Sequence, residues 1–172
     1  GVQSQSAPTS TQQTSGNIEI VFQPDPSIYD GRFANNGWLQ ELPKPLTKLT
    51  WDNAAIVSPA TANQLGVTTT PDFRGGEHGT NNASVVEIKV ADRSIKAPVW
   101  IQPGQPNGVV TLHFGYGRTR AGHVGTSNAQ KPVGFNAYEL RRSDGLWSTR
   151  AQLTKANYTY QLACTQAHYD ME

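Results

Sequence analysis

The stretch Ser84–Arg118, SVVEIKVADRSIKAPVWIQPGQPNGVVTLHFGYGR, decides the fold class. Apolar residues alternate with polar ones over residues 84–90, again over 95–101 and a third time over 110–116. This period of two is typical of half-buried strands. A short turn joins the first two runs into a hairpin, and a loop rich in Pro and Gly leads into the third. The stretch therefore predicts the core of a β-barrel.

The rest of the chain adds shorter β segments on both sides of this core. Ile18, Ile20 and Phe22 alternate with Glu19 and Val21, which predicts a first strand beginning near residue 17. Sixteen Gly and eleven Pro also suit a loop-rich β protein better than a helix bundle. Further strands are predicted over residues 54–57, around 146–147 and over 158–163.

One helix has clear end signals in the sequence. Ser58 stands as an N-cap, Pro59 at the first helical position and Gly66 just beyond the end, so a helix is predicted between them. Residues 27–50 show no period and are predicted to form a long loop, with Trp38 and Leu39 as its anchors. The polar residues 67–83 predict a second loop, and Phe135–Leu140 predicts a short strand or a helical turn.

The chain of 172 residues is long enough for one domain. Residues 1–16 carry no charge and are predicted to be a flexible linker or an added remnant, and residues 17–172 form the barrel domain. The chain starts at Gly1 rather than Met, and we expect it to be a piece of a larger protein. A net charge of +1 gives no reason to expect nucleic acid, and no apolar run predicts direct membrane insertion.

No motif in the chain names a reaction. The four histidines have no metal-binding spacing, and Cys164, the single cysteine, is predicted to be a buried inert thiol. Nucleotide-binding and nucleophile motifs are absent. Arg118 and Arg120 have the chemistry to hold a phosphate, but loop arginines more often only face solvent. The sequence predicts no catalytic residue, no metal ligand and no activity of this chain alone.

Several motifs in a fixed order resemble a known family. SPATANQLGV (58–67), the stretch 84–118 and GFNAYEL (134–140) follow one another as in the C-terminal dinucleotide-binding domain of the molybdopterin oxidoreductases. The resemblance extends from Ile18 to Glu172. Details such as WLQELP (38–43), LTWDNAA (49–55), GYGRTRAG (115–122) and TQAHYDME (165–172) look closest to one branch, the Tat-exported molybdopterin and iron–sulfur large subunit of alternative complex III, a quinol oxidoreductase.

This resemblance implies a fold, a cofactor and a location. The fold would be a six-stranded double-psi β-barrel with short helices and long loops. The cofactor would be molybdopterin guanine dinucleotide, with metals held elsewhere. The partners would be the remaining domains of the parent subunit and the iron–sulfur, cytochrome and membrane subunits of a periplasmic respiratory complex. The matching cofactor-binding positions are Asn36, Trp38, Gln40, Gly115, Tyr116, Gly117, Arg118 and Asn136.

Two departures from the family pattern leave three hypotheses open. Residues 31–40 read GRFANNGWLQ where the family has a His and Ser/Thr pattern, and Ser58-Pro59 replaces Asn-Pro. The chain is then a scaffold domain with a degenerate cofactor groove, or a functional dinucleotide-binding domain of a molybdenum reductase or dehydrogenase. The third hypothesis is a stand-alone β-barrel binding module for carbohydrate or protein. If Trp38 or Tyr116 fills the groove, a dinucleotide has no room.

Overall fold

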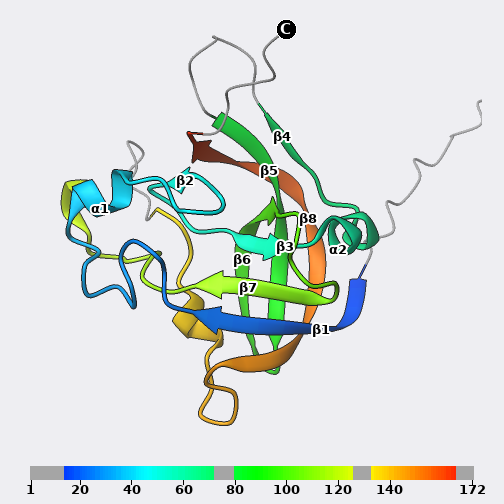
Figure 1. Cartoon of the computed structure of the whole chain (residues 1–172). Coiled ribbons are helices and arrows are strands. Elements are labelled where there is room, and N and C mark those ends of the chain that lie inside the picture. Colours follow the sequence, from blue (N-terminus) through cyan, green and yellow to red (C-terminus); the bar gives the residue numbers. More distant parts are fainter. Residues whose placement is uncertain (1–13, 72–79, 126–132, 166–172) are drawn as a thin grey trace, which may run out of the picture.

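A computed structural model describes residues 14–71, 80–125 and 133–165, and its strands close into a mixed β-barrel (Figure 1). The six barrel strands are β1 (Thr14–Gln23), β3 (Ala55–Val57), β5 (Thr80–Val90), β6 (Arg93–Ile101), β7 (Val109–His113) and β8 (Ser148–Cys164). They follow one another in the order β8-β1-β7-β3-β6-β5, and β5 pairs back onto β8. This closed barrel confirms the mainly β, six-stranded fold class predicted from the sequence.

The barrel is mixed because two of its strand pairs are parallel. β1 runs parallel to β7, with Ile20 opposite Val110, and β3 runs parallel to β6, with Ala55 opposite Val99. The other neighbours are antiparallel, including the predicted β5–β6 hairpin, in which Ile88 faces Ile95. Two short strands lie outside the ring: β2 (Leu49–Thr50) pairs with β8, and β4 (Thr69–Pro71) pairs with β5.

The alternating apolar residues fill the barrel interior, as the sequence pattern predicted. Ile20 and Leu112 are fully buried, and Phe22 stacks on Phe114 with 5.8 Å between the ring centroids. Each such side chain stabilises the fold by about 1.5–3 kcal/mol relative to its exposed state. The same core includes Ile18, Val86, Ile88, Val90, Val99, Val110, Ala151 and Leu153.

The helix α2 (Pro59–Leu65) matches its prediction at both ends. The Ser58 Oγ accepts a hydrogen bond from the Thr61 backbone N at 3.1 Å, and Gly66 ends the helix with a left-handed φ of 62°. Ala62 and Leu65 are buried against the barrel. This cap chemistry is local, so the sequence alone was sufficient to place the helix.

Two strands begin earlier than predicted. β1 starts at Thr14, inside the predicted linker 1–16, because the Thr14 backbone pairs with Thr154 on β8. The remaining linker residues, 1–13, lie outside the described residues. β5 starts at Thr80, inside the predicted loop 67–83, where it pairs with Ala163. Main-chain pairing needs no apolar side chain, and polar residues therefore gave no strand signal here.

The prediction of two separate late strands was wrong, because β8 is one strand of 17 residues. Its first part, from Ser148 to Thr154, pairs with β1, and its second part, from Gln152 to Ala163, pairs with β5. Leu146 and Trp147 precede it and are 47% and 59% exposed. One long strand that crosses between two partners closes the barrel.

The predicted long loop 27–50 contains a helix, α1 (Gly37–Glu41). Trp38, a predicted anchor, is 86% exposed, whereas Leu39 is partly buried and Gln40 is 2% exposed. The prediction for Trp38 was wrong because a helix of five residues is too short to show its buried face in the sequence. Two 3-10 helices, η1 (Gly122–Val124) and η2 (Ala137–Leu140), complete the described elements. Of the two alternatives predicted for Phe135–Leu140, a short strand or a helical turn, η2 shows the helical turn.

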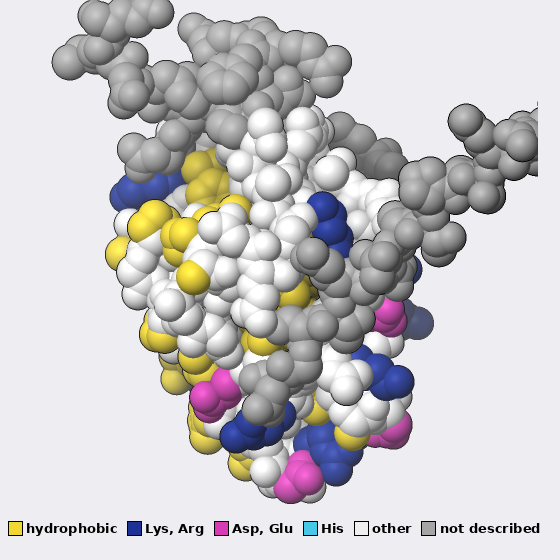
Figure 2. All heavy atoms as spheres, turned by 90° about the vertical axis from the view of Figure 1, so that its right-hand side faces the viewer, with side chains coloured by type: hydrophobic (Ala, Val, Ile, Leu, Met, Phe, Trp, Pro, Cys, Tyr) yellow, Lys and Arg dark blue, Asp and Glu magenta, His cyan; other side chains and the backbone are white. Residues whose placement is uncertain are grey.

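Opposite charges are interspersed on the face shown in Figure 2. Lys and Arg side chains alternate with Asp and Glu at its lower end. Among the described charged pairs, the Arg142 guanidinium lies 3.0 Å from Asp144 and 3.6 Å from Asp92. No helix in the described ranges is long and apolar enough to span a membrane.

Candidate functional site

The loops predicted to hold a cofactor meet at one end of the barrel, where two glycines pack backbone against backbone. Gly31 and Gly115 have φ values of 104° and 99°, which L side chains rarely adopt. A Cβ on Gly115 would lie 2.9 Å from the Gly31 Cα and 2.8 Å from the Ile28 side chain. The absence of a side chain at Gly115 therefore allows the 28–40 segment to pack closely against the chain after β7.

Gly117 makes a second close approach in the same region. Its φ is 71°, and a Cβ there would collide with the Asn136 backbone nitrogen and lie 2.5 Å from the Phe135 carbonyl carbon. The Gly117 N–H donates to the Val133 carbonyl oxygen at 2.9 Å. We call the segments 28–40, 115–118 and 133–136 the loop joint, because these contacts hold all three together.

Two long polar side chains of the loop joint bond to its own backbone. The Arg118 guanidinium donates to the Ala34 carbonyl oxygen at 2.8 Å and to the Asn35 side-chain oxygen at 2.5 Å. The buried Gln40 amide donates to the same Ala34 oxygen at 2.6 Å and to the Val124 carbonyl oxygen at 2.9 Å. Both side chains satisfy carbonyl groups that the irregular loops leave without strand partners.

The two asparagines of the predicted site are helix caps. The Asn36 Oδ1 accepts from the backbone N–H groups of Trp38 and Leu39, at 3.1 and 3.3 Å. The Asn136 Oδ1 accepts from the Tyr138 N–H at 3.2 Å and begins η2. Each oxygen satisfies amide groups that a helix start leaves open.

The Tyr116 side chain is a buried aromatic group of the loop joint. The side chain is 4% exposed and packs in one cluster with Ile28, Ala34 and Leu39. Its hydroxyl oxygen accepts a hydrogen bond from the Lys44 Nζ at 2.9 Å. Burial raises the pKa of the Tyr116 phenol far above its ordinary value, with Asp25 as the next cause, so the phenol stays protonated.

The structure thus brings most of the predicted site residues together and separates one. Gln40, Gly115, Tyr116, Gly117, Arg118 and Asn136 lie in the loop joint, with Asn36 at its α1 end. Trp38 faces solvent instead and does not fill a groove. The assignment of these residues to a cofactor stays a prediction.

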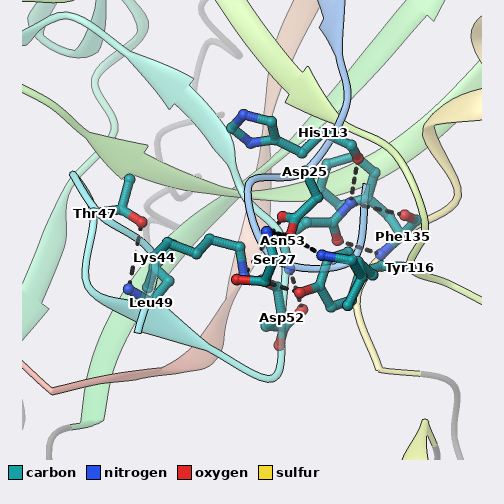
Figure 3. A network of polar contacts seen from close by, with 11 residues as sticks. Asp25, Ser27, Lys44, Thr47, Leu49, Asp52, Asn53, His113, Tyr116 and Phe135 are labelled. Atoms are coloured by element: carbon teal, nitrogen blue, oxygen red, sulfur yellow. Dashed lines mark hydrogen bonds and ion pairs between the residues drawn. The ribbon is translucent and has the colours of Figure 1, made fainter. Parts of the chain in front are cut away.

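A buried charged network next to the loop joint was not predicted from the sequence (Figure 3). The Lys44 Nζ donates to the Asp52 carbonyl oxygen at 2.8 Å and lies 3.6 Å from the Asp25 Oδ2. The Asp25 Oδ1 accepts from the N–H groups of Ser27 and Ile28, whereas its buried Oδ2 has no hydrogen-bond donor among the described residues. At 3.6 Å, the Lys44 Nζ is too far from the Asp25 Oδ2 for a hydrogen bond. The positive charge of Lys44 still compensates the negative charge of this oxygen as an ion pair.

Asp52 is a second buried carboxyl in the network. Its Oδ2 accepts a hydrogen bond from the Tyr160 hydroxyl at 2.6 Å, and its Oδ1 accepts from the Asn53 N–H at 3.0 Å. Burial raises the pKa of Asp52 to about 7, although the Tyr160 hydrogen bond lowers it. Burial also lowers the pKa of the Lys44 ammonium, against the opposing effects of Asp25 and Asp52.

Asn53 connects this network to the loop joint. Its side-chain amide donates to the carbonyl oxygens of His113 and Phe135 at 2.9 and 3.0 Å, and its Oδ1 accepts from the Phe135 N–H at 2.9 Å. The side chain therefore replaces a missing strand partner between the end of β7 and the 133–136 segment. The LTWDNAA motif was the one sequence signal near these residues.

The described residues offer little for metal chemistry. No group of three His, Cys, Asp or Glu side chains within residues 14–71, 80–125 and 133–165 could hold a metal ion. Cys164 is 4% exposed and its thiol lies 3.5 Å from the Thr47 carbonyl oxygen, which confirms the predicted buried thiol. His78 and His168 lie outside the described residues.

Comparison with known proteins adds no family assignment. No protein-family model matches the chain, and no curated protein matches it. The molybdopterin oxidoreductase resemblance therefore rests on the sequence motifs and stays a prediction.

Proposed function

We propose that the chain is the C-terminal domain of a molybdopterin-oxidoreductase-like subunit in a respiratory electron-transfer complex, and that it is a scaffold whose cofactor groove is degenerate. One observation carries the proposal: the polar groups that the resemblance assigns to a dinucleotide hold the loop joint itself together. Arg118 and Gln40 bond to backbone carbonyls, and the Asn36 and Asn136 oxygens cap helices.

These residues do not fit molybdopterin guanine dinucleotide as they stand. The phosphates of a dinucleotide need free guanidinium or amide donors, and pterin and guanine edges need both donors and acceptors. Arg118 commits two of its five N–H donors to Ala34 and Asn35, which holds the guanidinium against the loop joint, and the Gln40 side chain is only 2% exposed.

A scaffold role also agrees with large apolar side chains on the surface. Trp38 is 86% exposed, Phe33 is 51% exposed and Tyr29 is 48% exposed, all within or beside the loop joint. Exposed aromatic groups are enriched where proteins contact one another. In the proposal, such groups contact the remaining domains of the parent and the iron–sulfur, cytochrome and membrane subunits of a periplasmic complex.

Metal and pterin analysis of the purified parent protein tests the proposal. We expect no molybdenum above background and no fluorescent pterin after oxidative release. One molybdenum per chain, together with released pterin, would overturn the scaffold proposal and favour the functional dinucleotide-binding domain. A parent that purifies as a monomer without iron would instead favour a stand-alone binding module.

A further inference from the structure

A pocket of about 330 Å³ opens beside the buried network, and the function proposed above makes no use of it. It lies between the 44–47 loop, the segment after β1 and the strands β3 and β7. None of the eight predicted cofactor residues is among its lining residues. Its volume is near the lower limit of about 300–1,000 Å³ for ligand pockets, so a dinucleotide would not fit.

The walls of the pocket are mainly apolar. Pro24, Pro26 and Pro45 line it together with Leu46, and Ile56 forms part of the interior at 8% exposed. Leu46 is 80% exposed and lines the pocket, so most of its apolar surface contacts water. An apolar side chain placed against Leu46 would remove its exposed surface from water, while Ile56 is already buried and only lines the contact.

The pocket offers no free charge to a ligand among the described lining residues. Lys44 contributes its aliphatic stem, because its ammonium group is held by Asp25, Tyr116 and the Asp52 carbonyl. His113 lines the same pocket, and burial lowers the pKa of its imidazole, although the Asp25 carboxylate opposes this shift. A charged group would lose its hydration here without gaining a counter-charge.

Amide and hydroxyl groups on β7 and the preceding loop supply the polar contacts. The Gln105 Nε2 donates to the Thr111 Oγ1 at 3.0 Å, which leaves the Thr111 hydroxyl proton and the Gln105 carbonyl oxygen for a ligand. The Gln102 amide makes only a long contact of 3.4 Å with the Pro103 carbonyl. One donor and one acceptor side by side match the N–H and C=O groups of an extended peptide.

We propose that this pocket binds an uncharged, extended peptide segment of a partner protein, with one aliphatic or proline side chain inserted between Leu46 and Ile56. Thr111 and Gln105 bond to the peptide backbone. The pocket volume of about 330 Å³ allows one anchoring side chain of the peptide. The exposed Leu46 then contacts the peptide residue that follows the anchor.

Selection from a displayed library of random seven-residue peptides against the 172-residue chain tests this proposal. We expect enriched peptides without Asp, Glu, Lys or Arg at the centre and with one Leu, Ile, Met or Pro anchor. A synthetic version with blocked ends should shift the amide signals of Ile56, Thr111 and His113 saturably. The variant Leu46→Asp should weaken this peptide by about tenfold or more, because it places a charge against the anchor.

The matched control is Leu42→Asp, since Leu42 is 55% exposed on the same stretch of chain and does not line the pocket. This variant should leave the affinity within about twofold of the parent chain. Enrichment of charged peptides, equal weakening by both variants, or no enrichment beyond that seen with the Leu46→Asp chain would each overturn the proposal.

Discussion

Gly117 tests the loop joint at the scale of one residue. Gly117→Ala adds a Cβ against the backbone of Phe135 and Asn136, whereas Gly108→Ala adds one at a similar φ of 74° with nothing within 4 Å. We expect Gly108→Ala to cost about 1–2 kcal/mol for the left-handed conformation alone. Gly117→Ala should cost about 3 kcal/mol or more, because steric overlap adds to that strain.

Urea unfolding of both variants measures this difference directly. The φ angles of the two glycines are nearly the same, so the excess loss at Gly117 reports the closeness of the two segments. Equal losses of unfolding free energy would contradict the tight contact between residues 115–118 and 133–136.

Asp52 gives a prediction about pH at the same scale. Its pKa is raised to about 7 in the folded chain, whereas an unfolded Asp has a pKa of about 3.9. The folded state therefore binds more protons between these values, and its stability falls as the pH rises from about 4 to about 7. Asp52→Asn removes this dependence, because the Asn amide stays neutral and still reaches the Tyr160 hydroxyl.

The measurement is the unfolding free energy of both chains from pH 4 to pH 9. We expect the stability of the parent chain relative to Asp52→Asn to fall by up to about 4 kcal/mol as the pH rises from about 4 to about 7. Above pH 7 the difference should stay constant. A difference that is flat, or that grows in favour of the parent chain as pH rises, would contradict a buried Asp52 with a raised pKa.

Some of these residues could be predicted from the sequence and others could not. Motifs singled out Gly115, Gly117 and Asn136, although the structure uses them for packing and capping. Nothing in the linear pattern shows that Lys44, between two prolines, points inward. Two of its partners, Asp25 and Tyr116, belong to other segments of the chain, and only the folded barrel brings them to Lys44.

At the scale of elements, α1 depends on its cap. Asn36→Ala removes the acceptor for the Trp38 and Leu39 amides and should cost about 1 kcal/mol of stability. Asn36→Asp supplies the same acceptor and should restore the parent stability within about 0.5 kcal/mol. Thermal unfolding of the three chains measures both effects, and failure of Asp to rescue would argue that Asn36 has a role other than capping.

The elements also show which sequence signals are sufficient. The α2 helix was predicted within a residue because its cap, first-turn proline and terminal glycine are adjacent in sequence. The β8 strand was not predicted as one strand. Its partners Thr14–Val21 and Thr80–Lys89 are distant in sequence, and its exposed residues are mixed in polarity. An element whose boundaries are set by residues adjacent in sequence can be predicted from the sequence. An element whose boundaries are set by pairing with a distant strand cannot.

At the scale of the whole molecule, β8 closes the barrel, and Leu153 lies where its two partners overlap. Leu153 faces Ile88 on β5 and Ser15 on β1, and it is fully buried. Leu153→Ala should cost about 2–5 kcal/mol of unfolding free energy. Leu146→Ala, at a side chain 47% exposed before the strand, should cost less than about 1 kcal/mol, and similar losses in a denaturant titration would contradict this closure.

At this scale we propose that the loop joint holds the barrel end together and does not bind a nucleotide. Its most direct test is a titration of the chain with GMP and with molybdopterin guanine dinucleotide, followed through the amide signals of Gly117, Arg118 and Asn136. We predict no saturable shift at millimolar ligand, because the Arg118 and Gln40 donors stay bonded to Ala34. Saturable shifts at these three residues that disappear in Arg118→Ala would contradict the claim.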